Sequence, residues 1–162
     1  RLEHVVWGEV LWAATLGTVY ALIVTLVLIG FSLTGGLPLH WIGLFLVLPL
    51  LFLAALAFAT LGLLFTALVP SIDHMNIPFF LVIMPLGFAS STYFPLEGDS
   101  LWTQAWLVLN PLHHLAEGIR LLLLAGQLNH HLLSACALFV LMILLLVPID
   151  ERLLRRRVLG EG

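Results

Sequence analysis

Histidine is the residue type with the clearest chemical potential in this chain, because imidazole binds transition metals and transfers protons near neutral pH. Four of the seven histidines form two adjacent pairs, His113-His114 and His130-His131. Neighbouring side chains on a helix point about 100° apart, so neither pair chelates a metal as residues at positions i and i+4 do. We therefore expect interfacial polar contacts from these histidines, and no metal or haem cofactor.

Three consecutive hydroxyl side chains, Ser90, Ser91 and Thr92, offer a second kind of chemistry. A serine hydrolase within a membrane needs a serine and a histidine that face each other at depth. The long apolar runs have no histidine in their interiors, and the chain has no Gly-x-Ser-x-Gly sequence. We interpret the hydroxyls as caps for backbone carbonyls of a helix disturbed by proline, and we expect no catalytic residue.

The charged residues exclude several function classes. Of the 162 residues, 62% are hydrophobic and 9% are charged, with a mean hydropathy of +1.15 and a net charge of −3. Soluble domains have about 45–50% apolar and about 25% charged residues, so a soluble enzyme, a nucleic-acid binder and a disordered linker are excluded. The six cationic residues are all arginine. A P-loop ends in Gly-Lys-Ser/Thr, so this chain has no ATP site of that kind.

The elements that must position these residues are transmembrane helices. Four apolar runs, 10–33, 41–68, 77–94 and 132–149, are long enough for four spans of an all-α, polytopic helix bundle. Pro49 is expected to kink the second run, and Pro78 and Pro85 interrupt the third. The four runs contain no Asp, Glu, Lys or Arg. Ion-coupled carriers keep ionisable groups in their spans, which favours an energy source on another polypeptide.

The stretch between the third and fourth runs predicts two short helices at about 100–125, either re-entrant or interfacial. Asp99 or Ser100 can cap the first helix. Asn110 and Pro111 give an N-cap followed by proline at the first helical position, and Gly126 can end the second helix. This second helix would be about 22 Å long, which is too short to span comfortably.

The arginines that follow the fourth run predict the orientation. The positive-inside rule places Arg152, Arg155, Arg156 and Arg157 in the cytoplasm, together with the C-terminus. Four spans then put the start of the chain on the same side and leave 34–40 and 95–131 outside. The alternative is that the helix beginning at Pro111 also spans, in which case the start of the chain faces outward.

Small residues recur at four-residue spacing along the first run, at Ala13, Gly17 and Ala21. Such a stripe lets another helix approach closely. We interpret it as helix packing within the bundle, with a seam between two subunits as the alternative.

Several short sequence motifs occur in an order that resembles the permease subunit of type-2 ABC exporters, closest to the nodulation-factor (lipo-oligosaccharide) and drug-efflux permeases. They are ALVPSIDHMN at 67–76, PFFLVIMP at 78–85, FASSTYFPLE at 88–97 and NPLHHLAEGIR at 110–120. The resemblance extends over roughly 5–157. Since that family has six spans and this chain starts at Arg1 rather than Met, we expect a single transmembrane permease domain, 1–162, that holds the third to sixth spans as a C-terminal fragment. His113-His114 departs from the Thr or Ser more usual in the family.

The resemblance implies an export function powered from outside the chain. It implies a second permease subunit as a homodimer, cytoplasmic P-loop ATPase subunits, and a multi-pass place in the bacterial inner membrane with no nucleic-acid partner. The implied substrate is amphipathic, a lipid-linked saccharide or a hydrophobic drug-like molecule, and the chain itself is not an enzyme. The alternatives are an intramembrane enzyme that uses the outer histidines and a non-transporting membrane anchor or assembly subunit.

The resemblance also assigns two groups of residues. The ATPase-coupling segment would comprise Arg1, Glu3, His4 and Glu9, which could equally be an ordinary solvated flank of a membrane helix. The outer gate and exit motif would comprise Phe94, Pro95, Glu97, Asn110, Pro111, Glu117 and Arg120.

Overall fold

The computed structural model describes residues 2–93 and 100–159, and within these residues the chain forms helices and no strand. This confirms the prediction of an all-α fold. Three helices are long: α1 (Leu2–Leu33), α2 (Trp41–Leu68) and α7 (His130–Leu159). Each is long and apolar enough to cross a membrane, which confirms the first, second and fourth expected spans. Five residues with predicted roles lie outside the described residues: Arg1, Phe94, Pro95, Glu97 and Asp99.

Two of the long helices extend beyond the apolar runs that predicted them. The first run was bounded by Glu9, but α1 already begins at Leu2. The last run ends at Ile149, but α7 continues to Leu159 and carries the arginines as part of the helix. Hydropathy shows where the charged residues begin. The backbone hydrogen bonds of a helix can continue into water, so a helix can extend beyond its apolar segment.

The third expected span is a shorter and less regular helix than predicted. It comprises a 3-10 turn η1 (Ile72–Met75), α3 (Asn76–Pro78), a π-helical turn η2 (Phe79–Ile83) and α4 (Met84–Phe88). Together these residues extend over about 26 Å, and none of them is buried. The helix begins before residue 77 and ends at Phe88 instead of continuing to 94, so a fourth crossing stays a prediction.

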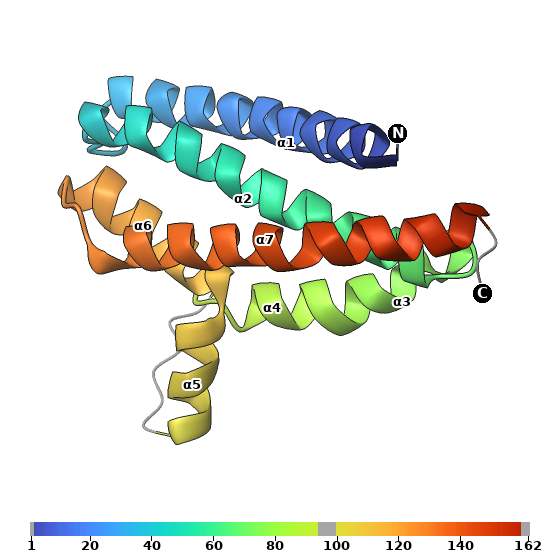
Figure 1. The fold of residues 1–162 in the computed structure, drawn as a ribbon. Coiled ribbons are helices and arrows are strands. Elements are labelled where there is room, and N and C mark those ends of the chain that lie inside the picture. Colours follow the sequence, from blue (N-terminus) through green and yellow to red (C-terminus); the bar gives the residue numbers. More distant parts are fainter. Residues whose placement is uncertain (1, 94–99, 160–162) are drawn as a thin grey trace.

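The central helix of the bundle is α2, which contacts α1 on one side and α7 and α6 on the other (Figure 1). Leu50, Ala54 and Ala57 of α2 pack against Ala135 and Phe139 of α7 in the main apolar cluster. The ring of Phe139 also lies edge-on to Phe58, with centroids 6.0 Å apart. The helix runs unbroken through Pro49.

The two predicted short helices are present as α5 (Leu101–Leu109) and α6 (Pro111–Ala125). Figure 1 shows α6 alongside α2 and α7, whereas α5 projects away from the bundle. A re-entrant or interfacial place for the two helices stays a prediction. Two glycines allow α6 to approach so closely. A Cβ at Gly43 of α2 would lie 2.8 Å from the carbonyl oxygen of Leu122, and one at Gly118 would lie 2.9 Å from Leu132 Cδ2.

The bundle has two distinct ends (Figure 1). At one end, called the terminal end below, α1 begins and α2 and α7 finish. At the other, called the loop end, lie the connection between α1 and α2 and the connection between α6 and α7. Arg157 of α7 joins helices at the terminal end, where its Nη1 donates to Thr66 O of α2 at 2.6 Å.

Candidate functional site

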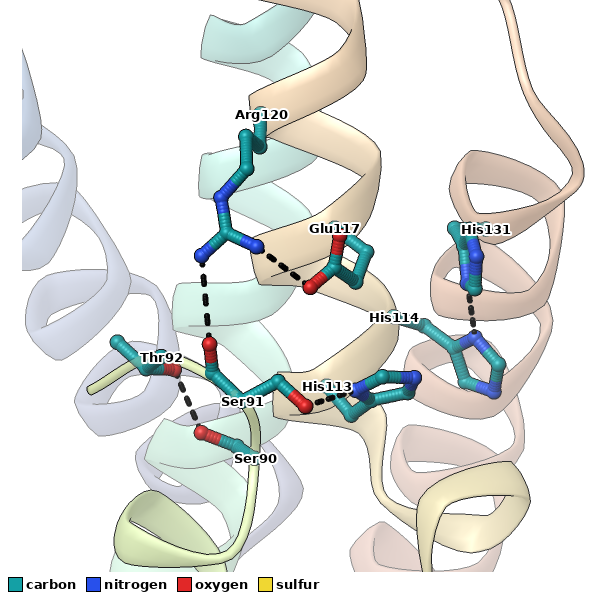
Figure 2. Close-up of polar contacts among 8 residues, drawn as sticks. All are labelled: Ser90, Ser91, Thr92, His113, His114, Glu117, Arg120 and His131. Carbon is teal, nitrogen blue, oxygen red and sulfur yellow. Dashed lines mark hydrogen bonds and ion pairs between the residues drawn. The ribbon is translucent and has the colours of Figure 1, made fainter. Parts of the chain in front are cut away.

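Polar side chains gather where the end of α4 meets α6 and the first turn of α7 (Figure 2). This polar cluster consists of Ser90, Ser91, Thr92, His113, His114, Glu117, Arg120 and His131. It is the densest group of polar side-chain contacts within the described residues 2–93 and 100–159. Its members come from three separate helical segments, so the tertiary structure creates the site.

Asn110 sets the position of α6 relative to α4. Its side chain is 2% exposed, and its Oδ1 accepts a hydrogen bond of 3.0 Å from the backbone N–H of Leu112. This is the N-cap that the Asn110-Pro111 pair predicted. Its Nδ2 donates in addition to the carbonyls of Leu86 at 3.0 Å and Ala89 at 2.8 Å. One buried amide therefore caps α6 and holds the end of α4 against it.

The end of α4 is shaped by two buried serines. Ser90 Oγ donates to Gly87 O at 2.6 Å, which confirms the predicted capping role of a hydroxyl here. Ser91 has φ +58°, a left-handed conformation that is uncommon for residues other than glycine and costs backbone energy. This conformation turns Ser91 toward α6, where its Oγ lies 3.0 Å from His113 Nδ1 and its carbonyl accepts from Arg120 Nη2 at 3.3 Å.

Glu117 and Arg120 form an ion pair on α6, with Nη1 and Oε1 2.6 Å apart. The Arg120 side chain is 45% exposed and that of Glu117 is 23% exposed, so the pair by itself adds little stability. Its structural effect is to aim the second guanidinium nitrogen at Ser91 O. The structure thus gathers four predicted exit residues, Asn110, Pro111, Glu117 and Arg120, on one short helix and its cap.

One histidine from each adjacent pair meets across two helices. His114 Nδ1 of α6 lies 2.9 Å from His131 Nδ1 of α7, and His114 Nε2 donates to Val108 O at 3.0 Å. The ring of His113 is edge-on to both, at centroid distances of 5.3 Å from His114 and 5.6 Å from His131. Burial, with a smaller contribution from the neighbouring His114, lowers the pKa of His113. Neither adjacent pair can chelate an ion alone, but side chains taken from both pairs do converge here.

The other predicted residues lie apart from the polar cluster. Glu3, His4 and Glu9 are exposed on the first turns of α1, near the terminal end. Within the small-residue stripe, Ala13 is exposed while Gly17 and Ala21 are partly buried. A Cβ at Gly17 would lie 3.2 Å from Ala55 Cβ of α2, so this glycine faces a neighbour within the bundle.

Asp150 is a residue of interest that the sequence analysis missed. It lies on α7 one residue beyond the predicted span, its side chain is completely buried, and neither carboxylate oxygen has a hydrogen-bond partner among the described residues. Helical spacing in the sequence could have indicated this burial, because Asp150 continues the buried face of α7 formed by Ala135, Phe139 and Val147. An apolar run that is ended at its first charged residue excludes Asp150 from this helical face.

Comparison with known proteins places this arrangement in context. A model of the family described as ABC-2 type transporter matches residues 4–124, which include every part of the polar cluster except His131. Nodulation protein J of Rhizobium leguminosarum bv. trifolii is 33% identical over 162 residues, covering 98% of this chain and 58% of the relative. Nodulation protein J of Rhizobium leguminosarum bv. viciae is 33% identical over 160 residues, covering 96% and 58%.

A third relative gives the same picture. Nodulation protein J of Rhizobium meliloti (strain 1021) is 32% identical over 161 residues, covering 98% of this chain and 58% of the relative. The chain therefore spans a little over half the length of these curated relatives. No solved structure gives a significant match. The family resemblance noted in the sequence is confirmed.

Proposed function

Because this chain belongs to the ABC-2 type transporter family, we propose that it forms part of the permease subunit of an exporter that moves an amphipathic substrate across the bacterial inner membrane. The observation that carries the proposal is the family match over residues 4–124. It coincides with three apolar helices that are long enough to cross a membrane and with a short helix, α6, whose cap Asn110 is hydrogen-bonded to the end of α4.

The energy source in this proposal is a separate P-loop ATPase. The chain has no lysine and hence no P-loop of its own, and its four apolar runs contain no Asp, Glu, Lys or Arg of the kind that ion-coupled carriers use. The exposed acidic and histidine side chains at the start of α1 offer a contact surface for such a partner. The proposed coupling segment comprises Arg1, Glu3, His4 and Glu9.

The proposed sidedness follows from the arginines of α7. Arg152, Arg155, Arg156 and Arg157 lie at the terminal end, so the positive-inside rule favours a cytoplasmic terminal end and C-terminus. The loop end, with α6 and the polar cluster, would then face outward. Phe94, Pro95 and Glu97 would join the cluster residues in the exit, and a second copy of the permease would complete the path.

The substrate class is part of the proposal. The curated relatives are named nodulation proteins, and the sequence resembles lipo-oligosaccharide and drug-efflux permeases. A substrate with apolar and polar parts would suit a path with apolar helix faces and a polar cluster at its outer end. We therefore propose a lipid-linked saccharide or a hydrophobic drug-like molecule as the cargo.

The test uses the full-length subunit, purified with its partner and reconstituted in liposomes. We expect a P-loop ATPase to co-purify and its ATP hydrolysis to depend on the permease. Glu3→Ala combined with Glu9→Ala should lower this stimulated hydrolysis, whereas Glu151→Ala, an acidic residue of α7 at the same end, should leave it unchanged.

Two results would contradict the proposal. Unchanged stimulation in the double variant would remove the coupling role from the start of α1. A subunit that purifies without any ATPase and shows hydrolytic activity of its own would favour the intramembrane enzyme instead of the exporter.

A further inference from the structure

Three imidazole rings converge at the contact between α6 and α7. Each of His113, His114 and His131 offers a ring nitrogen, and these three atoms all lie within 4.8 Å of one another. His114 is 7% exposed and the other two are partly buried. Figure 2 shows the three rings side by side, with His113 and His114 on α6 and His131 on the facing turn of α7.

Hydrogen bonds orient two of the rings in the manner of metal ligands. A carbonyl oxygen can only accept, so the 3.0 Å contact between His114 Nε2 and Val108 O places the proton of a neutral ring on Nε2. The lone pair of His114 Nδ1 then points at His131. Metal-binding histidines almost always donate their other N–H to a carbonyl, a carboxylate or water in this way. The Ser91 hydroxyl lies 3.0 Å from His113 Nδ1, and Nε2 of that ring makes no hydrogen bond to the part of the chain that the structure describes.

The spacing suits a tetrahedral ion. With Zn–N bonds of about 2.0–2.1 Å, two nitrogen ligands lie about 3.4 Å apart. The two Nδ1 atoms of His114 and His131 are 2.9 Å apart, and the set of three lies within 4.8 Å, so the ideal separation falls between these values. Small ring rotations would therefore bring all three nitrogens to one ion.

We propose that His113, His114 and His131 form a three-histidine site for a divalent zinc ion, with water in the fourth position. Imidazole nitrogen is a preferred ligand of Zn²⁺. His131 now shares a proton with His114, so it binds the ion after moving its proton from Nδ1 to Nε2 by exchange with water. The bound ion links α6 to α7, and the link reaches α4 through Ser91. This inference is independent of the transport proposal.

The experiment uses the full-length subunit, purified with an affinity tag that contains no histidine and stripped of metal with a chelator. Zn²⁺ binding is measured by competition with a chromophoric chelator, and Co²⁺ is used as a spectroscopic substitute for tetrahedral geometry. We expect one Zn²⁺ per chain at micromolar free Zn²⁺ and a tetrahedral Co²⁺ spectrum. Zn²⁺ should also raise the unfolding temperature, because it binds only the folded arrangement.

The variants separate a built site from loose histidine binding. His131→Ala should weaken Zn²⁺ binding by about 100-fold or more, since even the partners that orient ligands contribute 10- to 100-fold. His113→Ala should weaken it similarly. The matched control is His130→Ala, which removes the exposed histidine next to His131 and should leave the affinity within about twofold.

Folding is checked by gel filtration and circular dichroism, and His131→Gln, which keeps a polar side chain of related size, replaces any alanine variant that fails these checks. The proposal is overturned if the wild-type protein shows no saturable binding of one ion per chain. It is also overturned if His131→Ala or His131→Gln binds as tightly as wild type, or if His130→Ala loses as much affinity as they do. Failure here would leave ATPase coupling unaffected, so the two proposals fail separately.

Discussion

The contact of α2 with α1 and α7 and the junction between α4 and α6 hold the chain together by different means. In the first region, Gly17 faces Ala55, and Phe139 packs among alanines and leucines. The side-chain hydroxyls of α1 and α2 bond only to carbonyls of their own helix, as Thr60 does to Ala57 at 2.7 Å. At the junction, Asn110 and the polar cluster instead connect one helical segment to another.

The difference follows from what happens to the backbone. Along α2 the backbone N–H and C=O groups bond within the helix, except at Pro49, which has no N–H to donate. Lipid gives little hydrophobic drive for association, so close packing of small residues brings the helices together. At the end of α4 the helix stops beside other helices, and the freed carbonyls need donors. Asn110 and Arg120 supply those donors to Leu86, Ala89 and Ser91. Polar residues are therefore concentrated where the backbone breaks.

The largest expected effect comes from breaking the junction at Asn110. Asn110→Ala removes the cap of α6 and both donors to α4, and we expect the free energy of unfolding to fall by about 2–4 kcal/mol. Asn110→Asp keeps an oxygen for the Leu112 N–H but presents no donor to Leu86 and Ala89. It should therefore be nearly as unstable as the alanine variant in thermal unfolding in detergent. Wild-type stability for the aspartate variant would mean that only the cap matters.

The close approach of α6 to α2 is a further packed contact, and it can be broken without deleting a hydrogen-bonding side chain. A methyl group at Gly43 would lie 2.8 Å from the backbone oxygen of Leu122, so Gly43→Ala should push α6 from α2 and cost about 1–3 kcal/mol. Gly62 of the same helix is the matched control, because nothing lies within 4 Å of a Cβ placed there. Gly62→Ala should be neutral or stabilise by up to about 1 kcal/mol. Equal unfolding temperatures for the two variants would refute the close approach.

Asp150 sharpens the comparison, because it is a buried polar group of α7 that has no hydrogen-bond partner within residues 2–93 and 100–159, unlike the polar groups at the junction. Asp150→Leu removes this buried carboxylate and should stabilise the chain by about 1–2 kcal/mol. Glu151→Leu, on the next position of α7, should change the stability little. If Asp150→Leu destabilises the purified protein, the carboxylate has a partner in the assembled subunit.

The smallest expected effect is at the terminal end. Arg157 donates to the carbonyls of Thr66 and Ala67 in the last turn of α2 and to that of Pro70 just beyond the helix. Arg157→Gln should cost about 0.3–1 kcal/mol, less at high salt, because the side chain is exposed. Arg156→Gln on the neighbouring position removes the same charge and should have a smaller effect in the same unfolding measurement. Equal effects of the two substitutions would indicate that the stability depends only on the net charge of the C-terminal segment and not on the hydrogen bonds of Arg157.

Local signals explain the parts of the fold that could be predicted. Asn110-Pro111 and Gly126 marked both ends of α6, and Gly126 indeed ends it in a left-handed conformation with φ +64°. Composition alone indicated the three long spans. The end of α4 was misjudged by several residues, because it depends on donors that reach it from Asn110, more than twenty positions along the chain.

The candidate site was only partly predictable for the same reason. Asn110, Glu117 and Arg120 could be chosen from the family-like motif, and they do lie together on α6 and its cap. The contact between His114 and His131 could not be chosen, since the pairs were judged by their spacing in the sequence. Asp150 was overlooked because a charge after an apolar run is usually taken as the edge of the membrane.

By itself, the sequence determined that this protein is an all-α membrane protein, where α6 begins and ends, and to which family it belongs. Hydropathy, proline, glycine and capping residues act over a few neighbouring positions, so their effects can be read along the chain. The tertiary structure alone decided that one histidine of each pair meets the other, that α6 turns back beside α2 and α7, and that Asp150 is buried. Those outcomes depend on helix rotation, where one residue changes the direction of a side chain by about 100°, and on close approach at Gly43 and Gly118.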